Sequence, residues 1–197
     1  MKIAVFGAAG RTGREVVRQA LDRGHEVTAF VRDESVLDST DERLSVVAGD
    51  ARDAEAVERA LAQADGVISV LALTSADAEP GYSEATKAVV EAASRTGVHR
   101  LVVAANNDVL SDREVTGEFA AHAREHRRNR ETLEASGLDW TIGAAPWVTD
   151  DPATGTYQAA VDQKGPGRRL GAADFATFTL DALERGEWIG HVVGVSA

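Results

Sequence analysis

Three glycines near the start of the chain have the type and spacing of a phosphate-binding turn. Gly7, Gly10 and Gly13 stand at G-x-x-G-x-x-G spacing in the stretch GAAGRTG. In such a turn the first glycine permits a sharp bend, the second lets backbone approach a pyrophosphate, and the third lets the following helix pack closely on the strand. The diphosphate would lie on unpaired amide groups at the helix N-terminus, where the dipole favours an anion. The spacing predicts a dinucleotide site; the alternative is a glycine-rich turn without a ligand.

An arginine near the end of the next apolar run indicates which dinucleotide would bind. NAD-selective sites usually hold the ribose diol with a carboxylate at this position, whereas an arginine suits the 2′-phosphate of NADP. Here the run ends Phe30-Val31-Arg32, and Arg11 in the glycine turn could bring a second guanidinium to the same phosphate. Asp33, one residue later, argues against this interpretation, and both arginines could be ordinary surface residues. We expect NADP(H) to be preferred over NAD(H).

These residues depend on alternating strands and helices for their position. Ile3 to Phe6 is an almost unbroken apolar run, as a parallel strand covered on both faces requires. We predict strands at 3–6, 25–31, 44–48, 66–71, 101–105, 138–143 and 191–195, and helices at 11–23, from about 53, at 81–96, 115–136 and 175–183. This alternation predicts an α/β fold: one doubly wound parallel sheet, the Rossmann fold, in a single domain of residues 1–197.

Residues 149–171 break this alternation. They contain several Gly and Pro residues and the apolar/polar alternation TYQAAVDQ, which is typical of a strand or hairpin. We expect these residues to form a small C-terminal lobe on the substrate side of the sheet.

Residues that follow the strands are candidates for the site, because ligands of doubly wound sheets lie beyond the carboxyl ends of the strands. Asp50, followed by Ala51, comes after the third strand, where its carboxylate could accept the adenine amino group. The alternative is that Asp50 caps the helix that begins near residue 53. Ala72 and Leu73 should line the cofactor groove beyond the fourth strand. Residues 105–107, at the end of the fifth strand, should take part in the chemistry.

Composition argues against several classes of protein. The net charge of −11 disfavours a nucleic-acid partner, whose phosphates would be repelled. The sequence has no run of about 18 apolar residues, so we expect no membrane span. It contains no cysteine, which excludes disulfides and thiol chemistry. The first residues enter a strand without a basic and then apolar leader, so a cytoplasmic location is expected.

The order of the motifs resembles that of a known group, the short-chain dehydrogenase/reductase superfamily in its atypical branch. GAAGRTG, VTAFVRD, VAGD, the E-x-SGL-x-W turn, APW-V-x-D and D-x-A-x-F follow one another along the chain. The similarity is to NAD(P)H-binding, NmrA-like proteins, and among them to the biliverdin reductase B or flavin reductase group. It covers nearly the whole chain.

The resemblance implies a set of cofactor contacts. The glycine turn would hold the diphosphate, Arg32 the 2′-phosphate, Asp50 and Ala51 the adenine, and Leu71 and Ala72 the ribose. The cofactor-binding residues predicted on this basis are Gly7, Ala9, Gly10, Arg11, Thr12, Gly13, Arg32, Asp50, Ala51, Leu71, Ala72, Leu73, Ala105, Pro146 and Val148.

The chain departs from this family at positions that carry chemistry. The usual Tyr-x-x-x-Lys acid is absent, because neither Tyr82 nor Tyr157 is followed by a lysine four residues later. Asn107 stands where the resembling group has a serine after the fifth strand. Trp147 stands where that group has a histidine, after a proline and beside the nicotinamide. His126 does match a family histidine near the cofactor, although a solvated helix histidine is the alternative.

These departures favour an acceptor that needs no strong acid. A ketone reductase must donate a proton to the developing alkoxide, which Asn107 cannot do at neutral pH. A reduced flavin or quinone is a delocalised anion that can take its proton from water. Trp147 offers such a ring a flat face, unless it is a core or lid tryptophan. We expect an NADPH-dependent reductase of a planar small molecule, with FMN or another flavin as a candidate acceptor and Asn107, Trp147 and His126 at the reacting end.

Other interpretations remain open. The chain could be a non-catalytic NADP(H)-binding redox sensor of the NmrA type, in which the departures mark lost chemistry. His122 and His126 have the i, i+4 spacing of a zinc pair, but Ala123 stands where a metalloprotease helix has glutamate, and we predict no metal. The arginines of residues 124–130 are interleaved with glutamates, which is typical of a solvated helix face. Both a monomer and a homodimer are compatible with the sequence.

Overall fold

The computed structural model describes residues 1–37, 40–72, 81–111, 115–117 and 120–197. The strands are β1 (Lys2–Phe6), β2 (Glu26–Val31), β3 (Leu44–Ala48), β4 (Gly66–Ser69), β5 (Arg100–Asn106), β6 (Asp139–Ala145), β7 (Trp147–Thr149), β8 (Gln158–Val161), β9 (Arg169–Gly171) and β10 (His191–Ser196). The helices are α1 (Arg11–Asp22), α2 (Ala54–Leu61), α3 (Gly81–Thr96), α4 (Ala120–Glu134) and α5 (Ala172–Arg185), with 3₁₀ turns η1 (Glu34–Val36) and η2 (Asn107–Leu110). None of the helices in these ranges is long and apolar enough to cross a membrane.

One eight-stranded sheet runs through the described part of the chain, in the order β3-β2-β1-β4-β5-β6-β10-β8. Its neighbouring strands are parallel up to β10, and β8 is antiparallel to β10 at the edge. The chain moves outward from β1 to β3, then returns to β4 on the other side of β1. Open α/β sheets bind their ligands at such a reversal. The predicted doubly wound α/β fold is therefore confirmed.

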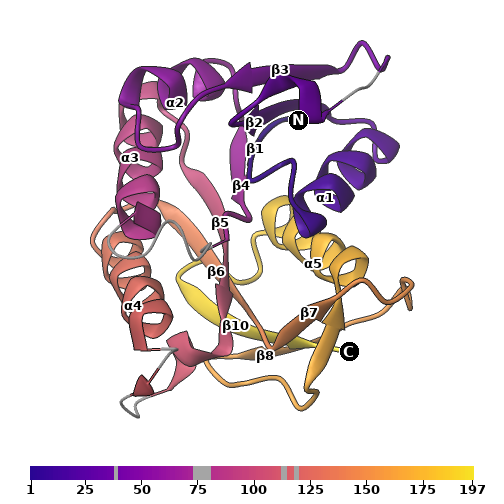
Figure 1. Cartoon of the computed structure of the whole chain (residues 1–197), viewed down its shortest axis with the longest axis vertical. Coiled ribbons are helices and arrows are strands. Elements are labelled where there is room, and N and C mark those ends of the chain that lie inside the picture. The colour runs from indigo at the N-terminus through magenta and orange to yellow at the C-terminus, as the bar shows by residue number, and fades with distance from the viewer. Residues whose placement is uncertain (38–39, 73–80, 112–114, 118–119) are drawn as a thin grey trace.

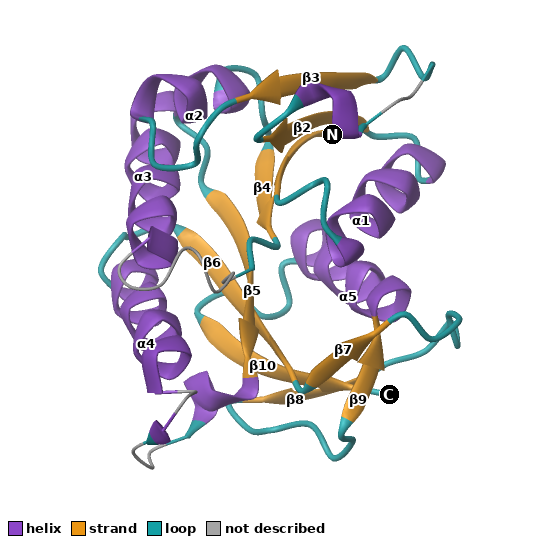
Figure 2. Ribbon diagram, in the orientation of Figure 1, coloured by secondary structure: helices purple, strands orange, loops and turns teal. Residues whose placement is uncertain are grey.

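Two helical layers cover the sheet. Figures 1 and 2 show α1 and α5 against one face and α2, α3 and α4 against the other. Side chains of β1 point to alternate faces, so Ile3 and Val5 join the core under α1 and α5, while Ala4 and Phe6 join the core under α2 and α3. Both faces exclude water, which explains why β1 is apolar at nearly every position.

The observed elements follow the predicted alternation closely. The strand predicted at 44–48 and the helix predicted at 81–96 have the observed bounds, and the helix expected at 115–136 is α4. The fourth strand ends at Ser69 and not at Leu71. Val70 and Leu71 consequently leave the sheet and line the pocket described below.

The segment 149–171 contains the expected strand but no hairpin of its own. β8 pairs antiparallel with β10 and extends the main sheet, while β9 pairs in parallel with β7 in a separate two-stranded sheet. The two strands of the segment thus have different partners. The hairpin interpretation was wrong because β8 pairs with β10, outside the segment, and β9 pairs in parallel with β7, at the start of the segment. A local pattern does not reveal these partners.

Two buried carboxylates hold this segment to α5. Asp174, which is 1% exposed, accepts hydrogen bonds from the main-chain N–H groups of Thr154 and Gly155, each at 3.0 Å, and from the Thr154 hydroxyl at 2.8 Å. The Tyr157 hydroxyl donates to Asp181 at 2.8 Å. Charge-assisted bonds of this kind are among the stronger ones in proteins, so α5 fixes the position of the segment.

The packing of the glycine turn makes a prediction about stability. A Cβ at Gly13 would lie 2.0 Å from the Gly7 carbonyl oxygen, whereas a Cβ at Gly10 would meet only that oxygen, at 3.2 Å. We expect Gly13→Ala to lower the free energy of unfolding by about 3 kcal/mol, because backbone must move to admit the methyl group. Gly10→Ala, the matched control, should lower it by about 1 kcal/mol or less. Urea unfolding measures both, and equal effects would contradict this account of the turn.

Candidate functional site

The glycine turn joins β1 to α1 at the switch point of the sheet. Gly7 has φ of +80°, and a Cβ there would lie 2.7 Å from the carbonyl oxygen of Val70 at the end of β4. The Gly10 N–H donates to the Gly7 carbonyl at 3.0 Å, and α1 begins at the next residue without a side-chain cap. The first main-chain N–H groups of α1 therefore face the switch point, where they can bind an anion. The turn fits a dinucleotide diphosphate.

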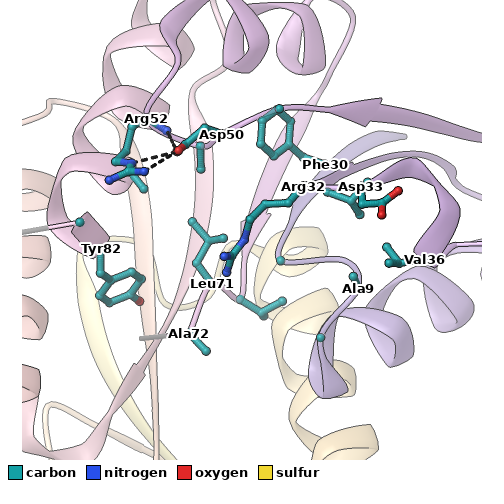
Figure 3. Close-up of a pocket in the computed structure, with 18 residues that line it drawn as sticks. Ala9, Phe30, Arg32, Asp33, Val36, Asp50, Arg52, Leu71, Ala72 and Tyr82 are labelled. Carbon is teal, nitrogen blue, oxygen red and sulfur yellow. Dashed lines mark hydrogen bonds and ion pairs between the residues drawn. The ribbon is translucent and has the colours of Figure 1, made fainter. Parts of the chain in front are cut away.

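A pocket of about 350 Å³ runs from this turn across the ends of β2 and β3 (Figure 3). Its lining includes many of the residues that the sequence predicted for the cofactor: Gly7, Ala9, Gly10, Arg32, Asp50, Ala51, Leu71 and Ala72. The other lining residues are Phe30, Val31, Asp33, Val36, Gly49, Arg52, Val70, Gly81, Tyr82 and Ala85. The pocket is elongated over adjacent strand ends, as the adenosine half of a dinucleotide requires.

Arg32 and Asp33 end the second strand in different orientations. In Figure 3 the Arg32 side chain extends toward Leu71, and the Asp33 carboxylate points away from it. The Asp33 carboxylate accepts a hydrogen bond from the Ser35 main chain at 2.9 Å and caps the turn η1. This backbone contact also lowers the pKa of Asp33. Asp33 is thus engaged by its own turn, which weakens it as a sign of NAD selectivity.

Asp50 is engaged by Arg52, two residues further along. One carboxylate oxygen accepts from the Arg52 main-chain N–H and Nε, each at 2.9 Å, and the other accepts from Nη2 at 2.5 Å. These contacts lower the pKa of Asp50 to about 2, and the charge of Arg32 contributes to the shift. The helix after β3 is capped by Asp53, which accepts from the Glu55 N–H at 3.0 Å. The alternative that Asp50 caps this helix is therefore wrong.

Several predicted cofactor residues do not line this pocket: Arg11, Thr12, Gly13, Ala105, Pro146 and Val148. Leu73 lies outside the described residues. The Arg11 guanidinium donates to the Val148 carbonyl at 2.7 Å and pairs with Asp150 at 2.7 Å. The structure therefore places Arg11 across the turn, beside β7, and not next to Arg32 as we expected.

Asn107 and Trp147 follow the ends of neighbouring strands. Asn106 of β5 is paired with Ala145 of β6, so the residues after them emerge at the same edge of the sheet. Trp147 is 72% exposed, which excludes the alternative of a core tryptophan. The Oδ1 atom of Asn107 is buried and has no hydrogen-bond partner among the described residues. This edge thus presents a free aromatic face, and a buried acceptor without a partner among the described residues follows the neighbouring strand.

A polar interface between α3 and α4 lies beside the pocket. The Tyr82 hydroxyl donates to the Ala104 carbonyl at 2.7 Å, and its ring meets the edge of the His126 ring at a centroid distance of 5.3 Å. Buried Glu125 accepts from the main chain and hydroxyl of Ser83 at 2.8 and 3.1 Å. Neither polar atom of buried Asn129 makes a hydrogen bond of normal geometry within the described residues. Polar side chains thus replace part of the apolar packing between these helices.

Neither tyrosine is suited to proton donation. Burial raises the pKa of Tyr82 above its ordinary value, and its hydroxyl is already bonded to main chain. Burial likewise raises the pKa of Tyr157, whose hydroxyl donates to Asp181. Burial lowers the pKa of His126 to about 4, with a further contribution from His122. His126 is therefore neutral near pH 7. Its Nδ1 atom is buried and its ring packs against Tyr82, so it is not a fully solvated histidine.

The described residues hold no group of three or more His, Cys, Asp and Glu side chains that could bind a metal ion. His122 and His126 share a helix face. The carboxylate of Glu125, between them in the sequence, accepts hydrogen bonds from Ser83. The ranges that the structure describes thus offer the histidine pair no third ligand.

Sequence reasoning missed Arg52, Tyr82, Phe30 and Val36 as pocket residues. The Asp50-x-Arg52 spacing directly after an apolar strand could have identified Arg52, because Asp side chains often bond the backbone two residues on. Tyr82 was considered only as a catalytic acid and was set aside for want of a lysine. No local signal marks Phe30 and Val36, whose position depends on the tertiary fold.

The neutral state of half-buried His126 predicts a pH dependence of stability. Its folded pKa of about 4 lies below the ordinary value of 6.5, so the unfolded chain binds the proton more tightly. Its contribution is fully present above pH 6.5 and is lost as the pH falls toward 4, on the order of 3 kcal/mol in all. His126→Gln should flatten the decline in unfolding free energy between pH 7 and 4.5. Exposed His99→Gln is the control, and the same slope in both variants would contradict this assignment.

Comparison with known proteins agrees with this geometry. A family model described as NAD(P)H-binding matches residues 7–185. The uncharacterised protein YwnB of Bacillus subtilis is 29% identical over 213 residues, which cover 95% of this chain and 94% of YwnB. A protein of Streptococcus pneumoniae provisionally named an NADH-flavin reductase has a TM-score of 0.83 at 25% identity, with 99% of this chain and 98% of that one covered.

A solved structure with bound cofactor shares the fold. A short-chain dehydrogenase/reductase of Veillonella parvula, in complex with NADP, has a TM-score of 0.80 at 18% identity, over 100% of this chain and 94% of that one. The match of the family model covers most of the chain, including the glycine turn, the pocket and α5. The chain therefore belongs to the NAD(P)H-binding family of Rossmann-fold proteins.

Proposed function

We propose that this protein is an NADPH-dependent oxidoreductase that reduces a flat acceptor such as a flavin or quinone. The observation that carries the proposal is the edge formed after β5 and β6. There, exposed Trp147 and the Asn107 acceptor, which has no partner among the described residues, follow neighbouring strand ends, beyond the switch point where the dinucleotide would bind.

Preference for NADPH is supported by the position of Arg32. Its side chain extends from the end of β2 into the pocket, where a dinucleotide places its adenosine ribose. A guanidinium can bind the 2′-phosphate with two parallel hydrogen bonds. The protein carries a net charge of −11, so a local cation is needed to offset its repulsion of a phosphate.

A flat acceptor is supported by the groups at the reacting edge. Trp147 offers most of its indole surface, on which a planar ring can stack. The Asn107 oxygen is buried and has no hydrogen-bond partner among the described residues, so a ligand that gains access to it could satisfy it with an N–H donor. A flavin combines a planar ring with an N–H group at its edge. The provisional naming of the Streptococcus pneumoniae protein as an NADH-flavin reductase points to the same class of acceptor.

Reduction of a flavin or quinone does not require a side chain that donates a proton. When bound, the reduced nicotinamide supplies a hydride. Trp147 and Asn107 would hold the acceptor ring against it, and the indole would shield the ring from water on one side. The reduced ring can take its proton from water, since Tyr82 and Tyr157 are bonded elsewhere and His126 is neutral near pH 7.

A second function is favoured by the same shortage of acids. The protein would then be a non-catalytic NADP(H)-binding redox sensor of the NmrA type, in which Asn107 and Trp147 replace lost catalytic groups. Binding of NADPH without turnover of any acceptor would support it.

The placement of Arg32 predicts cofactor selectivity. NADPH should bind at least tenfold more tightly than NADH, because a charge-assisted phosphate contact contributes about 1.5–3 kcal/mol. Arg32→Ala should remove the preference for NADPH, because it should weaken the binding of NADPH and leave that of NADH unchanged. Titration of protein fluorescence gives both dissociation constants, with Arg18→Ala, an arginine paired on the outer face of α1, as the control. Equal affinities of the wild-type protein for the two cofactors would contradict NADPH selectivity.

The placement of Trp147 predicts how the acceptor binds. Trp147→Ala should raise the KM for the acceptor about tenfold or more, since it removes both stacking and apolar burial. Asn107→Ala should have a smaller effect, of about 1 kcal/mol. The dissociation constant of NADPH should barely change in either variant. Steady-state NADPH oxidation with FMN, riboflavin and a soluble quinone measures these effects.

Ile189→Ala removes another exposed apolar side chain and serves as the control. If the wild-type protein binds NADPH and no flat acceptor gives turnover above background, the reductase proposal fails and the sensor takes its place.

A further inference from the structure

The Asp50–Arg52 pair lies in the part of the pocket that follows β3. Both residues line the pocket, and they are joined by three contacts: the Arg52 main-chain N–H and Nε to one carboxylate oxygen, and Nη2 to the other. In Figure 3, Asp50 lies between Arg52 and Arg32. The carboxylate thus accepts two hydrogen bonds from one edge of the Arg52 guanidinium, and these bonds fix the plane of the guanidinium.

The order of the strands relates this pair to the parts of a dinucleotide. The diphosphate belongs at the glycine turn after β1, and the ribose of the adenosine belongs at the end of β2, where Arg32 stands. β3 is the next strand outward, so the base that follows the ribose reaches the residues after β3. These residues include Asp50 and Arg52.

The charge of Arg52 is paired directly with Asp50. The Asp50 carboxylate neutralises the Arg52 guanidinium at contact distance, so the pair as a unit has little net attraction for a phosphate. A planar guanidinium held at one edge can still stack on an aromatic ring through its faces. Leu71 and Ala72 supply apolar surface in the same pocket.

We infer that Arg52 stacks on the adenine ring of the cofactor, and that Asp50 is the positioning residue that holds it there. The inference rests on the proposed binding of NADP(H) in this pocket. It gives Asp50 a different role from that of a hydrogen-bond acceptor for the adenine amino group. Arg32 then recognises the 2′-phosphate, and Arg52 contributes equally to NADPH and NADH.

Dissociation constants of the full-length protein for NADPH and NADH test this role. Arg52→Ala should raise the dissociation constants of NADPH and NADH by the same factor, about tenfold, so that the ratio of the two constants is unchanged. Arg52→Lys should weaken them nearly as much, because lysine keeps the charge but lacks the planar face. Arg59→Ala, an exposed arginine of α2 outside the pocket, is the charge-matched control and should change neither constant. The inference would be overturned if Arg52→Ala raised the dissociation constant of NADPH alone, or if it changed neither constant.

A deaminated cofactor separates the two roles of Asp50. Reduced nicotinamide hypoxanthine dinucleotide lacks the 6-amino group but keeps a flat base, so the wild-type protein should bind it within about threefold of NADH if stacking dominates. Asp50→Asn should weaken the binding of both NADH and its deaminated analogue. Adding Asp50→Asn to Arg52→Ala should not weaken binding further. If the wild-type protein binds NADH much more tightly than the deaminated cofactor, and Asp50→Asn removes this difference, Asp50 recognises the 6-amino group directly. That result would overturn the inference.

The outcomes also separate this inference from the function on which it rests. Circular dichroism establishes that each variant is folded. Absence of NADPH binding by the wild-type protein would overturn both proposals. Firm NADPH binding that is unaffected by Arg52→Ala would overturn only the inference about the adenine.

Discussion

The site depends on the close approach of main chain at the switch point of the sheet. The carbonyl oxygen of Gly7 lies where a Cβ of Gly13 would be, and Gly7 itself lies against the end of β4 at Val70. Side chains at these positions would push α1 away from β1 and would separate β1 from β4. Because they are absent, the uncapped amino end of α1 faces the crevice between the strands. The same contact that fixes the first turn of α1 thus creates an anion site.

The two ends of the site carry different kinds of side chain. The end beyond β2 and β3 carries Arg32 and the Asp50–Arg52 pair. The end beyond β5 and β6 presents Trp147 and Asn107, with the Arg11–Asp150 ion pair beside β7. Under the proposed function, phosphate contacts at the Arg32 end would supply binding energy that positions an acceptor beside Trp147 and Asn107, neither of which is an acid.

Much of the fold could be predicted from the sequence, because local pattern and global fold agree there. The apolar run at β1, the glycine spacing and the helical periodicity of α3 each specify their own element, and their alternation specifies the sheet. Arg32 could be placed from its position after β2 alone. The partners of β8 and β9 could not, since they come from distant parts of the chain. The charged partners of Arg11 and Asp50, which are Asp150 and Arg52, could not be predicted from the glycine turn or from the strand ends alone.

A crystal structure of the protein with NADP⁺ and FMN would test the central claim most directly. The account predicts the diphosphate at the amino end of α1, the 2′-phosphate within hydrogen-bond distance of Arg32, and the flavin ring against Trp147 with its N–H edge toward Asn107. A dinucleotide whose 2′-phosphate points away from Arg32, or a nicotinamide directed away from the edge after β5 and β6, would contradict it.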